Sequence, residues 1–307
     1  MIGQSWTGDV RIISGSDGAV KGMWGVRAGV PAIACLPQPD EFTGRRVVAS
    51  GADDGSVDLW YLSTSAAAAS SSASDAAGGL LQHAQAKVQH DGAVLSLAAA
   101  PAAEGGSAQL ASASADGTLR LWDCGQLLAS TSQLGVPGGA QLHACAWVQA
   151  GQVATAGGDG RLCLWDSRQL GGAPAAAAAV GAPVLSLAAV AAGGQHLLVA
   201  GDQLGRLSVY DPRSFTAPLR RLQPHADSVH ALAAAASGEG ALVASGADDG
   251  GVALLDCARL DEAPRQLVPA RREGEAPCYV RALAWGGADG RQLFRGGWDQ
   301  TVVAVPL

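Results

Sequence analysis

The sequence predicts an all-β fold, a β-propeller of seven blades whose first blade is incomplete at the N-terminus. One observation behind this prediction is a repeated pattern of a strand, an acidic turn with glycine, and a second strand. The other is the even spacing of these repeats along the chain. Because radial closure with four to eight blades protects the sheet edges, we expect residues 1–307 to form a single domain.

The first blade is predicted from residues 4–13, which read as the end of a repeat. Five segments then share the full pattern: 48–60, 110–122, 153–165, 199–210 and 243–255. Each follows a short apolar strand, and these strands are 33–36, 94–98, 142–147, 184–188 and 229–233. Residues 280–285 and 293–305 supply a last copy. Six full copies and one partial copy make seven blades.

The turns and strand ends explain the pattern physically. A two-residue hairpin turn needs positive φ, which Asp-Gly supplies at low cost. The pairs that do so begin at Asp54, Asp116, Asp159 and Asp249. The second strands close on an aromatic or apolar residue, expected to be a core wedge: Trp60, Trp122, Trp165, Tyr210 and Leu255. After a longer first interval these positions recur every roughly 43 to 45 residues, which is typical of WD-repeat blades.

Two histidines, His90 and His225, stand just before the first strand of their repeats. In WD-repeat proteins, which these repeats resemble, such a histidine bonds a serine or threonine and the turn aspartate of its blade. The resemblance implies structural networks of His90 with Asp116 and of His225 with Asp249. A histidine, aspartate and serine together also look like a catalytic triad, but we favour the structural interpretation.

The long first interval has a visible cause, a Ser, Ala and Gly tract at 64–79 between two blades. Such a composition predicts a mobile loop, with a phosphorylated or docking segment as the alternative. A shorter tract at 171–179 is interpreted in the same way.

Composition and charge argue against several classes of function. The net charge of −7 argues against nucleic-acid binding and suits basic protein partners instead. The six cysteines show no metal-ligand spacing, so neither metal nor cofactor is expected. No catalytic fingerprint is present, so we do not expect an enzyme.

The uncharged stretch 173–192 contains Pro174, Gly181 and Pro183 and is mostly alanine, which argues against a membrane span. Without a signal-peptide pattern, we expect a cytoplasmic and nuclear protein.

Beyond the repeats, the chain resembles one family, the methylosome WD-repeat subunit, the partner of the type II protein arginine methyltransferase. The segments that carry the resemblance are 5–10, 28–30, 48–60, 162–168, 201–211, 279–285 and 297–303, and the resemblance implies a strand at 28–30. The most specific is Gly297-Trp298-Asp299 in the last repeat, because ordinary WD repeats have a serine or an aspartate before the turn.

The resemblance implies a scaffold without an active site that recruits basic substrates, such as histones and Sm proteins, to the methyltransferase. Trp6 matches an aromatic of the family's first blade that anchors the methyltransferase, and it is a candidate because buried Trp is enriched at interface hot spots. The alternative is that Trp6 packs only against its own blade. Trp298 is a further candidate for partner binding.

A competing interpretation is a substrate receptor for a cullin-RING ubiquitin ligase. Residues 153–168 resemble the box that docks such propellers on the ligase adaptor, with Arg168 as the key contact. A Trp-Asp-x-Arg sequence occurs in many WD repeats, so a generic protein-interaction scaffold also stays open. Trp6 and Arg168 are the residues that discriminate between the two named complexes.

Overall fold

The computed structural model describes residues 8–13, 20–26, 28–37, 45–62, 81–101, 108–124, 129–135, 138–169, 173–235, 241–270, 278–286, 291–297, 299 and 301–307. The chain divides into two compact units, Met1–Leu142 and His143–Leu307. All the regular elements within the described ranges are β-strands. Nowhere in these ranges is there a helix of the length and hydropathy needed to span a membrane.

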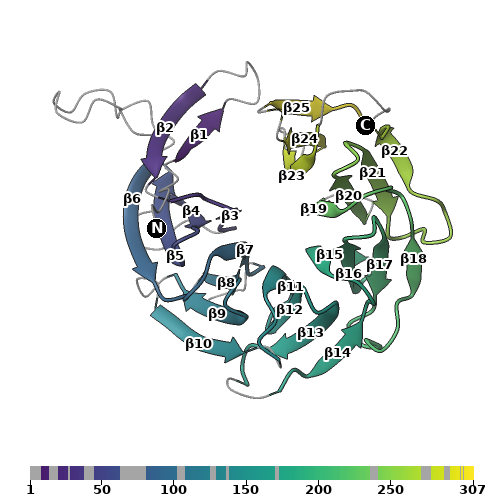
Figure 1. Ribbon diagram of the computed structural model, residues 1–307, viewed down its shortest axis with the longest axis horizontal. Coiled ribbons are helices and arrows are strands. Elements are labelled where there is room, and N and C mark those ends of the chain that lie inside the picture. Colours follow the sequence, from purple (N-terminus) through teal and green to yellow (C-terminus); the bar gives the residue numbers. More distant parts are fainter. Residues whose placement is uncertain are drawn as a thin grey trace, which may run out of the picture. The chain divides into compact units, whose positions relative to one another are not determined.

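The first unit contains a two-stranded hairpin and two four-stranded antiparallel sheets (Figure 1). The hairpin strands are β1 (Gly8–Ile13) and β2 (Val20–Val26). The next sheet contains β3 (Ala32–Cys35), β4 (Arg46–Gly51), β5 (Ser56–Leu62) and β6 (Leu81–Val88). The one after it contains β7 (Val94–Ala99), β8 (Gln109–Ser114), β9 (Thr118–Asp123) and β10 (Ala129–Gly135). In both four-stranded sheets the strands follow in chain order, and β3 contacts β7.

The second unit contains three sheets of four strands and one of three. The four-stranded sheets contain β11 (Leu142–Gln149) to β14 (Ala176–Ala179), β15 (Val184–Ala192) to β18 (Arg220–Leu222), and β19 (Val229–Ala234) to β22 (Arg265–Val268). Their middle strands are β12 (Gln152–Gly157), β13 (Arg161–Asp166), β16 (Gln195–Asp202), β17 (Leu207–Tyr210), β20 (Leu242–Ala247) and β21 (Val252–Asp256). The last sheet has β23 (Val280–Gly286), β24 (Gln292–Gly297) and β25 (Val302–Val305). The first strands β15, β19 and β23 lie side by side (Figure 1).

The tight turns between the second and third strands use glycine where the sequence places it. Gly55, Gly117, Gly160 and Gly250 have φ of 82°, 79°, 69° and 78°. Residues with a Cβ rarely adopt this left-handed region. The Asp-Gly pairs therefore fix the central hairpins of four of the described blades.

The core lies between the faces of neighbouring sheets. In the second unit, Leu162 and Leu164 of β13 pack in one cluster with Leu198 and Tyr210 of the following blade. In the first unit, Val57 of β5 belongs to a cluster that includes Leu110 and Trp122 of the next blade. Alternation along each strand points apolar side chains at both neighbouring sheets, which is how the blades hold one another.

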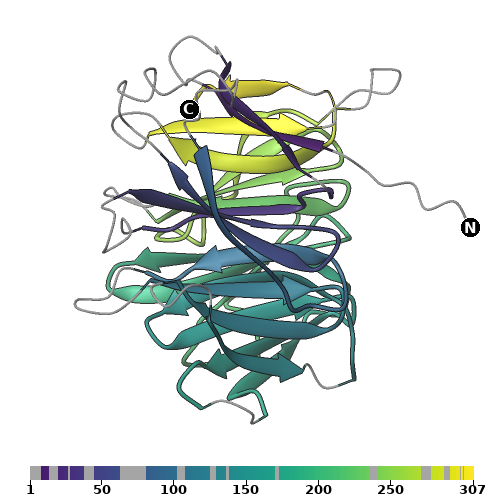
Figure 2. The ribbon, with the colours of Figure 1, turned by 90° about the vertical axis from the view of Figure 1, so that its left-hand side faces the viewer.

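The fold is an all-β WD-repeat β-propeller, but the prediction of seven blades is wrong. The described residues form six blades, five with four strands and one with three. The strands β1 and β2, dark purple in Figure 2, pair with each other from Gly8↔Val26 to Ile13↔Val20. In the described part no third strand joins them. An alternating sequence predicts strands but does not say whether enough of them pair to form a blade.

Two local predictions also differ from the structure. Residues 28–30 form no strand, and the Gly29 carbonyl instead accepts a hydrogen bond of 3.0 Å from the Asp53 amide. Part of the alanine tract 171–179, expected to be a loop, is the outer strand β14 (Ala176–Ala179), paired with β13. The predicted mobile loop 64–79 lies outside the described residues.

Candidate functional site

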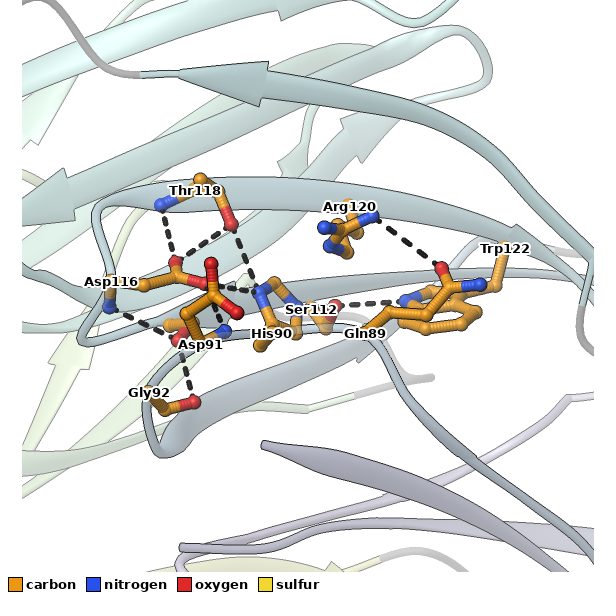
Figure 3. Close-up of polar contacts among 10 residues, drawn as sticks. Gln89, His90, Asp91, Gly92, Ser112, Asp116, Thr118, Arg120 and Trp122 are labelled. Atoms are coloured by element: carbon orange, nitrogen blue, oxygen red, sulfur yellow. Dashed lines mark hydrogen bonds and ion pairs between the residues drawn. The ribbon is translucent and has the colours of Figure 1, made fainter. Parts of the chain in front are cut away.

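His90 lies at the centre of a polar network in the blade β7–β10 (Figure 3). Its Nδ1 atom is 3.2 Å from Asp116 Oδ2 and 2.9 Å from Thr118 Oγ1. Its Nε2 atom is 2.7 Å from Ser112 Oγ. The Trp122 indole N–H donates to the same hydroxyl at 2.8 Å. The structure thus joins the loop before β7 to β8, β9 and the turn between them.

The geometry of this network differs from that of a working triad. Ser112 and Trp122 are fully buried, and His90 is 3% exposed. The serine hydroxyl contacts both the imidazole and the indole. A nucleophilic serine must reach a substrate carbonyl while its base orients it. Ser112 is instead enclosed by the blade that it ties together.

The protonation states fit a structural network. Burial lowers the pKa of His90 and outweighs the opposing charge of Asp116. Burial would raise the pKa of Asp116, but hydrogen bonds from Thr118 and from the Asp91 amide outweigh it and lower the pKa. A neutral imidazole beside an ionised carboxylate is therefore the stable arrangement near neutral pH.

His225 makes a second network in the blade β19–β22. Its Nδ1 atom is 3.3 Å from both oxygens of Asp249, and its Nε2 atom is 2.9 Å from Ser245 Oγ. The Ala226 amide also donates to Asp249 at 2.9 Å. The position of the closing tryptophan is taken by Leu255, which is buried. The network thus keeps its histidine and aspartate without an indole donor.

Two further blades keep the tryptophan but lack the histidine. The indole N–H groups of Trp60 and Trp165 each donate at 2.8 Å, to Ser50 Oγ and Thr155 Oγ1. Asp54 and Asp159 accept the amide two residues further on, at 3.0 Å in both cases. No described histidine contacts either aspartate. In these two blades the structure joins the tryptophan to the strand hydroxyl, and the turn aspartate bonds the backbone of its own turn.

Arg168 is displayed at the surface after β13. Its side chain is 78% exposed, and its Nε and Nη2 atoms each lie 2.9 Å from an oxygen of Asp166. These hydrogen bonds lower the pKa of Asp166 to about 2. Arg213, which our sequence reasoning missed, makes the same paired contact with Asp211 after β17. The signal was present, because residues 211–213 repeat the Asp-x-Arg pattern of 166–168.

A cavity of about 460 Å³ opens on the blade β3–β6, and no sequence pattern predicted it. Its polar lining includes Asp54, Asp58 and His83, beside the ring of Trp60. Asp58 and His83 were not candidates, because neither belongs to the motif that the repeats share. A comparison of equivalent positions between blades would have singled them out.

The remaining predictions concern two partner-binding tryptophans, metal binding and the cysteines. Trp6 and Trp298 lie outside the described residues. Within the described ranges, no group of three or more His, Cys, Asp or Glu side chains is arranged to hold a metal ion. All six cysteines are free thiols, and Cys35 is exposed.

Three segments of the chain, residues 84–123, 125–166 and 216–256, match the family described as WD domain, G-beta repeat. No curated protein matches the chain. The WD40 repeats and the β-propeller fold support membership of the WD-repeat superfamily. WD40 propellers typically serve as non-catalytic scaffolds for protein interactions, although a fold alone does not dictate a function.

Proposed function

From its WD40 repeats and propeller fold, we propose that the chain is a non-catalytic scaffold of a protein arginine methyltransferase complex. In this role it binds the type II methyltransferase and presents basic substrates such as histones and Sm proteins to it. The resemblance of segments along the chain to the methylosome WD-repeat subunit supports the choice of partner. The net charge of −7 suits basic substrates, because complementary charge steers association.

The observation that carries the scaffold role is the burial of both groupings that resemble a triad. Ser112 and Ser245 are fully buried, and each hydroxyl contacts the histidine of its own blade. Both groups therefore stabilise the blades, and what remains for function is the surface of the repeats. This supports protein binding over acyl transfer at these two positions.

The test is capture of the type II arginine methyltransferase of the same organism by the tagged chain, comparing wild type with Trp6→Ala. Loss of an interface anchor of about 2 kcal/mol predicts roughly thirtyfold weaker binding. Leu204→Ala is the control, because Leu204 is a large apolar side chain with 54% exposure that the proposal does not place at the interface. Failure of the folded wild-type chain to capture the methyltransferase contradicts the proposal.

One observation favours a second candidate, a substrate receptor of a cullin-RING ubiquitin ligase. The Arg168 guanidinium is exposed and held in place by two hydrogen bonds to Asp166, as an adaptor contact would require. Capture of the ligase adaptor by wild type, lost in Arg168→Ala, supports this role. The control is Arg259→Ala, an arginine of similar exposure, at 66%. Equal capture by wild type and Arg168→Ala excludes Arg168 as the contact.

A further inference from the structure

The blade β3–β6 lacks the histidine of its neighbour. The Asp53 amide donates to the carbonyl of Gly29 at 3.0 Å, and the equivalent bond of the next blade ends on the carbonyl of Ala93 at 2.9 Å. His90 stands three residues before Ala93, and Val26 stands three residues before Gly29. Valine has no side-chain hydrogen-bonding group. The turn aspartate and the strand serine of this blade therefore have no imidazole to join them.

An aspartate and a tryptophan that are largely buried in the blade of His90 are more open in this blade. Asp54 is exposed, whereas the side chain of Asp116, its counterpart beside His90, is 12% exposed. Trp60 is partly exposed, whereas Trp122 and Trp165 are 0% and 3% exposed. A carboxylate and an indole ring are thus accessible together at one place in the sheet.

The cavity of about 460 Å³ lies at this place. Ser56, Asp58 and Trp60 alternate along β5 and therefore share one face of the sheet. The register of β6 sets Val88 opposite Ser56, Ala86 opposite Asp58 and His83 opposite Trp60. The cavity thus has an acidic and aromatic floor on β5 and a largely apolar side on β6. Its volume is in the range of pockets that hold small ligands or anchoring side chains.

The charge of the cavity is one-sided. Asp54 and Asp58 contribute carboxylates, and neither lysine nor arginine is among the described residues that line it. Asp58 stands two residues before Trp60, where the next blade has Arg120 two residues before Trp122. His83 Nε2 lies 3.1 Å from Asp58 Oδ1, and the Ser56 hydroxyl donates to Asp58 Oδ2 at 3.4 Å, a long bond that leaves this oxygen able to accept a further donor. A cation beside these two carboxylates is favoured by Coulomb attraction, and an indole face adds to it.

We propose that this cavity binds an arginine side chain of a basic peptide from a protein partner. The guanidinium lies between the carboxylates of Asp54 and Asp58 and against the Trp60 ring, and its aliphatic stem packs on Ala86 and Val88. Arginine fits better than lysine, because its planar fork bonds carboxylates in pairs and stacks on aromatic rings. The proposal deepens the proposed function, on which it rests for the source of such peptides.

The first test varies the peptide and leaves the protein unchanged. The probe is an acetylated peptide of the sequence glycine, arginine, glycine, arginine, glycine, titrated calorimetrically into the full chain. Citrulline at both arginine positions keeps the shape and removes the charge, and we expect binding to weaken about tenfold or more. Equal binding of the two peptides, or no binding of the arginine peptide, overturns the proposal.

The second test varies the cavity. Asp58→Asn and Asp54→Asn remove one charge each at nearly constant volume, and each should weaken the arginine peptide about tenfold. Asp261→Asn is the matched control, because Asp261 is an exposed aspartate of the other compact unit. If all three variants bind the arginine peptide equally weakly, the peptide is attracted to the acidic surface in general, and the proposed site is wrong. Circular dichroism of each variant confirms that it is folded.

Capture of the methyltransferase by the same variants separates the two proposals. We expect Asp58→Asn to bind the methyltransferase as wild type does, because the cavity holds substrate. If the wild-type chain captures the methyltransferase but does not bind the arginine peptide, only the proposal for the cavity is contradicted. If it binds the peptide but does not capture the methyltransferase, only the proposed partner is contradicted.

Discussion

At the scale of single residues, the buried histidines hold the blades together by using both ring nitrogens. His90 reaches an aspartate and a threonine on one side and a serine on the other. Each of these groups is removed from water when the blade folds, so each needs a partner. Removing the His90 imidazole should therefore lower the free energy of unfolding.

Replacing this histidine should destabilise the chain strongly. His90→Ala leaves the hydroxyl of Ser112 and a carboxylate oxygen of Asp116 without their imidazole partner, and we expect unfolding to become easier by about 2–4 kcal/mol. Urea unfolding measures the change. His196→Ala is the control, because His196 is exposed, and it should change stability by less than about 0.5 kcal/mol. Similar losses for the two variants would show that the network contributes little.

The same histidine predicts a dependence of stability on pH. Burial lowers the pKa of folded His90 below 6.5, so the unfolded chain binds its proton more readily. The stability from neutral His90 is thus complete above about pH 6.5 and is lost as the pH falls through the lowered folded pKa. His230, whose pKa burial also lowers, acts in the same direction.

We therefore expect the free energy of unfolding to fall between about pH 7.5 and pH 5.5, by at most about 1.4 kcal/mol per pH unit for each histidine. Urea unfolding across this range measures the slope. In His90→Gln the slope should be shallower, and in the exposed control His196→Gln it should match wild type. An unchanged slope in His90→Gln contradicts the assigned protonation.

At the scale of elements, the hairpin between the second and third strands depends on its glycine. Gly160 has a φ of 69°, and a Cβ built on it lies 2.8 Å from the carbonyl oxygen of Ala182. Gly181 has a φ of 88°, but none of the described atoms lies within 4 Å of its Cβ position. The two positions share the backbone conformation and differ in the contact.

Replacing each of these two glycines with alanine separates the stability cost of backbone strain from that of a steric clash. Gly181→Ala should cost about 1–2 kcal/mol, the ordinary penalty for a left-handed residue. Gly160→Ala should cost at least about 1 kcal/mol more, because the neighbouring backbone must also move. Chemical denaturation of both variants measures the difference. Equal losses would mean that the turn adjusts freely around Ala182.

The inner strands could be predicted from the sequence and the outer ones could not. The segments 48–60 and 110–122 combine apolar strands with an Asp-Gly turn, and their hairpins follow from local chemistry alone. The outer strand β14 is four alanines, a residue with low strand propensity, and only its pairing with β13 makes it a strand. The candidate site was likewise predictable from the sequence only in part. His90 and Asp116 carried a recognisable pattern, whereas the cavity lies in a blade that has no such histidine and is lined by residues of no shared motif.

At the scale of the whole molecule, the count of blades depends on pairing that no local pattern contains. Residues 4–13 alternate as a blade strand would, but the described β1 pairs with β2 alone. A two-stranded hairpin is marginal by itself, so six sheets of three or four strands carry the fold. The single domain over residues 1–307 stays a prediction.

The single domain predicts cooperative unfolding. Tryptophan fluorescence and far-UV circular dichroism should report one coincident transition in urea, as expected of a two-state domain. The stability of a repeat array is shared among neighbours, so the loss of one blade should bring down the next. Two separated transitions would show that residues 1–307 unfold as more than one unit.

The most direct test of the scaffold role is the activity of the type II arginine methyltransferase on a histone-tail peptide, with and without the purified chain. We expect no methylation by the chain alone and a several-fold rise in the kcat/KM of the methyltransferase when the chain is added. An unchanged kcat/KM at saturating chain would contradict the claim that this propeller presents basic substrates to the enzyme.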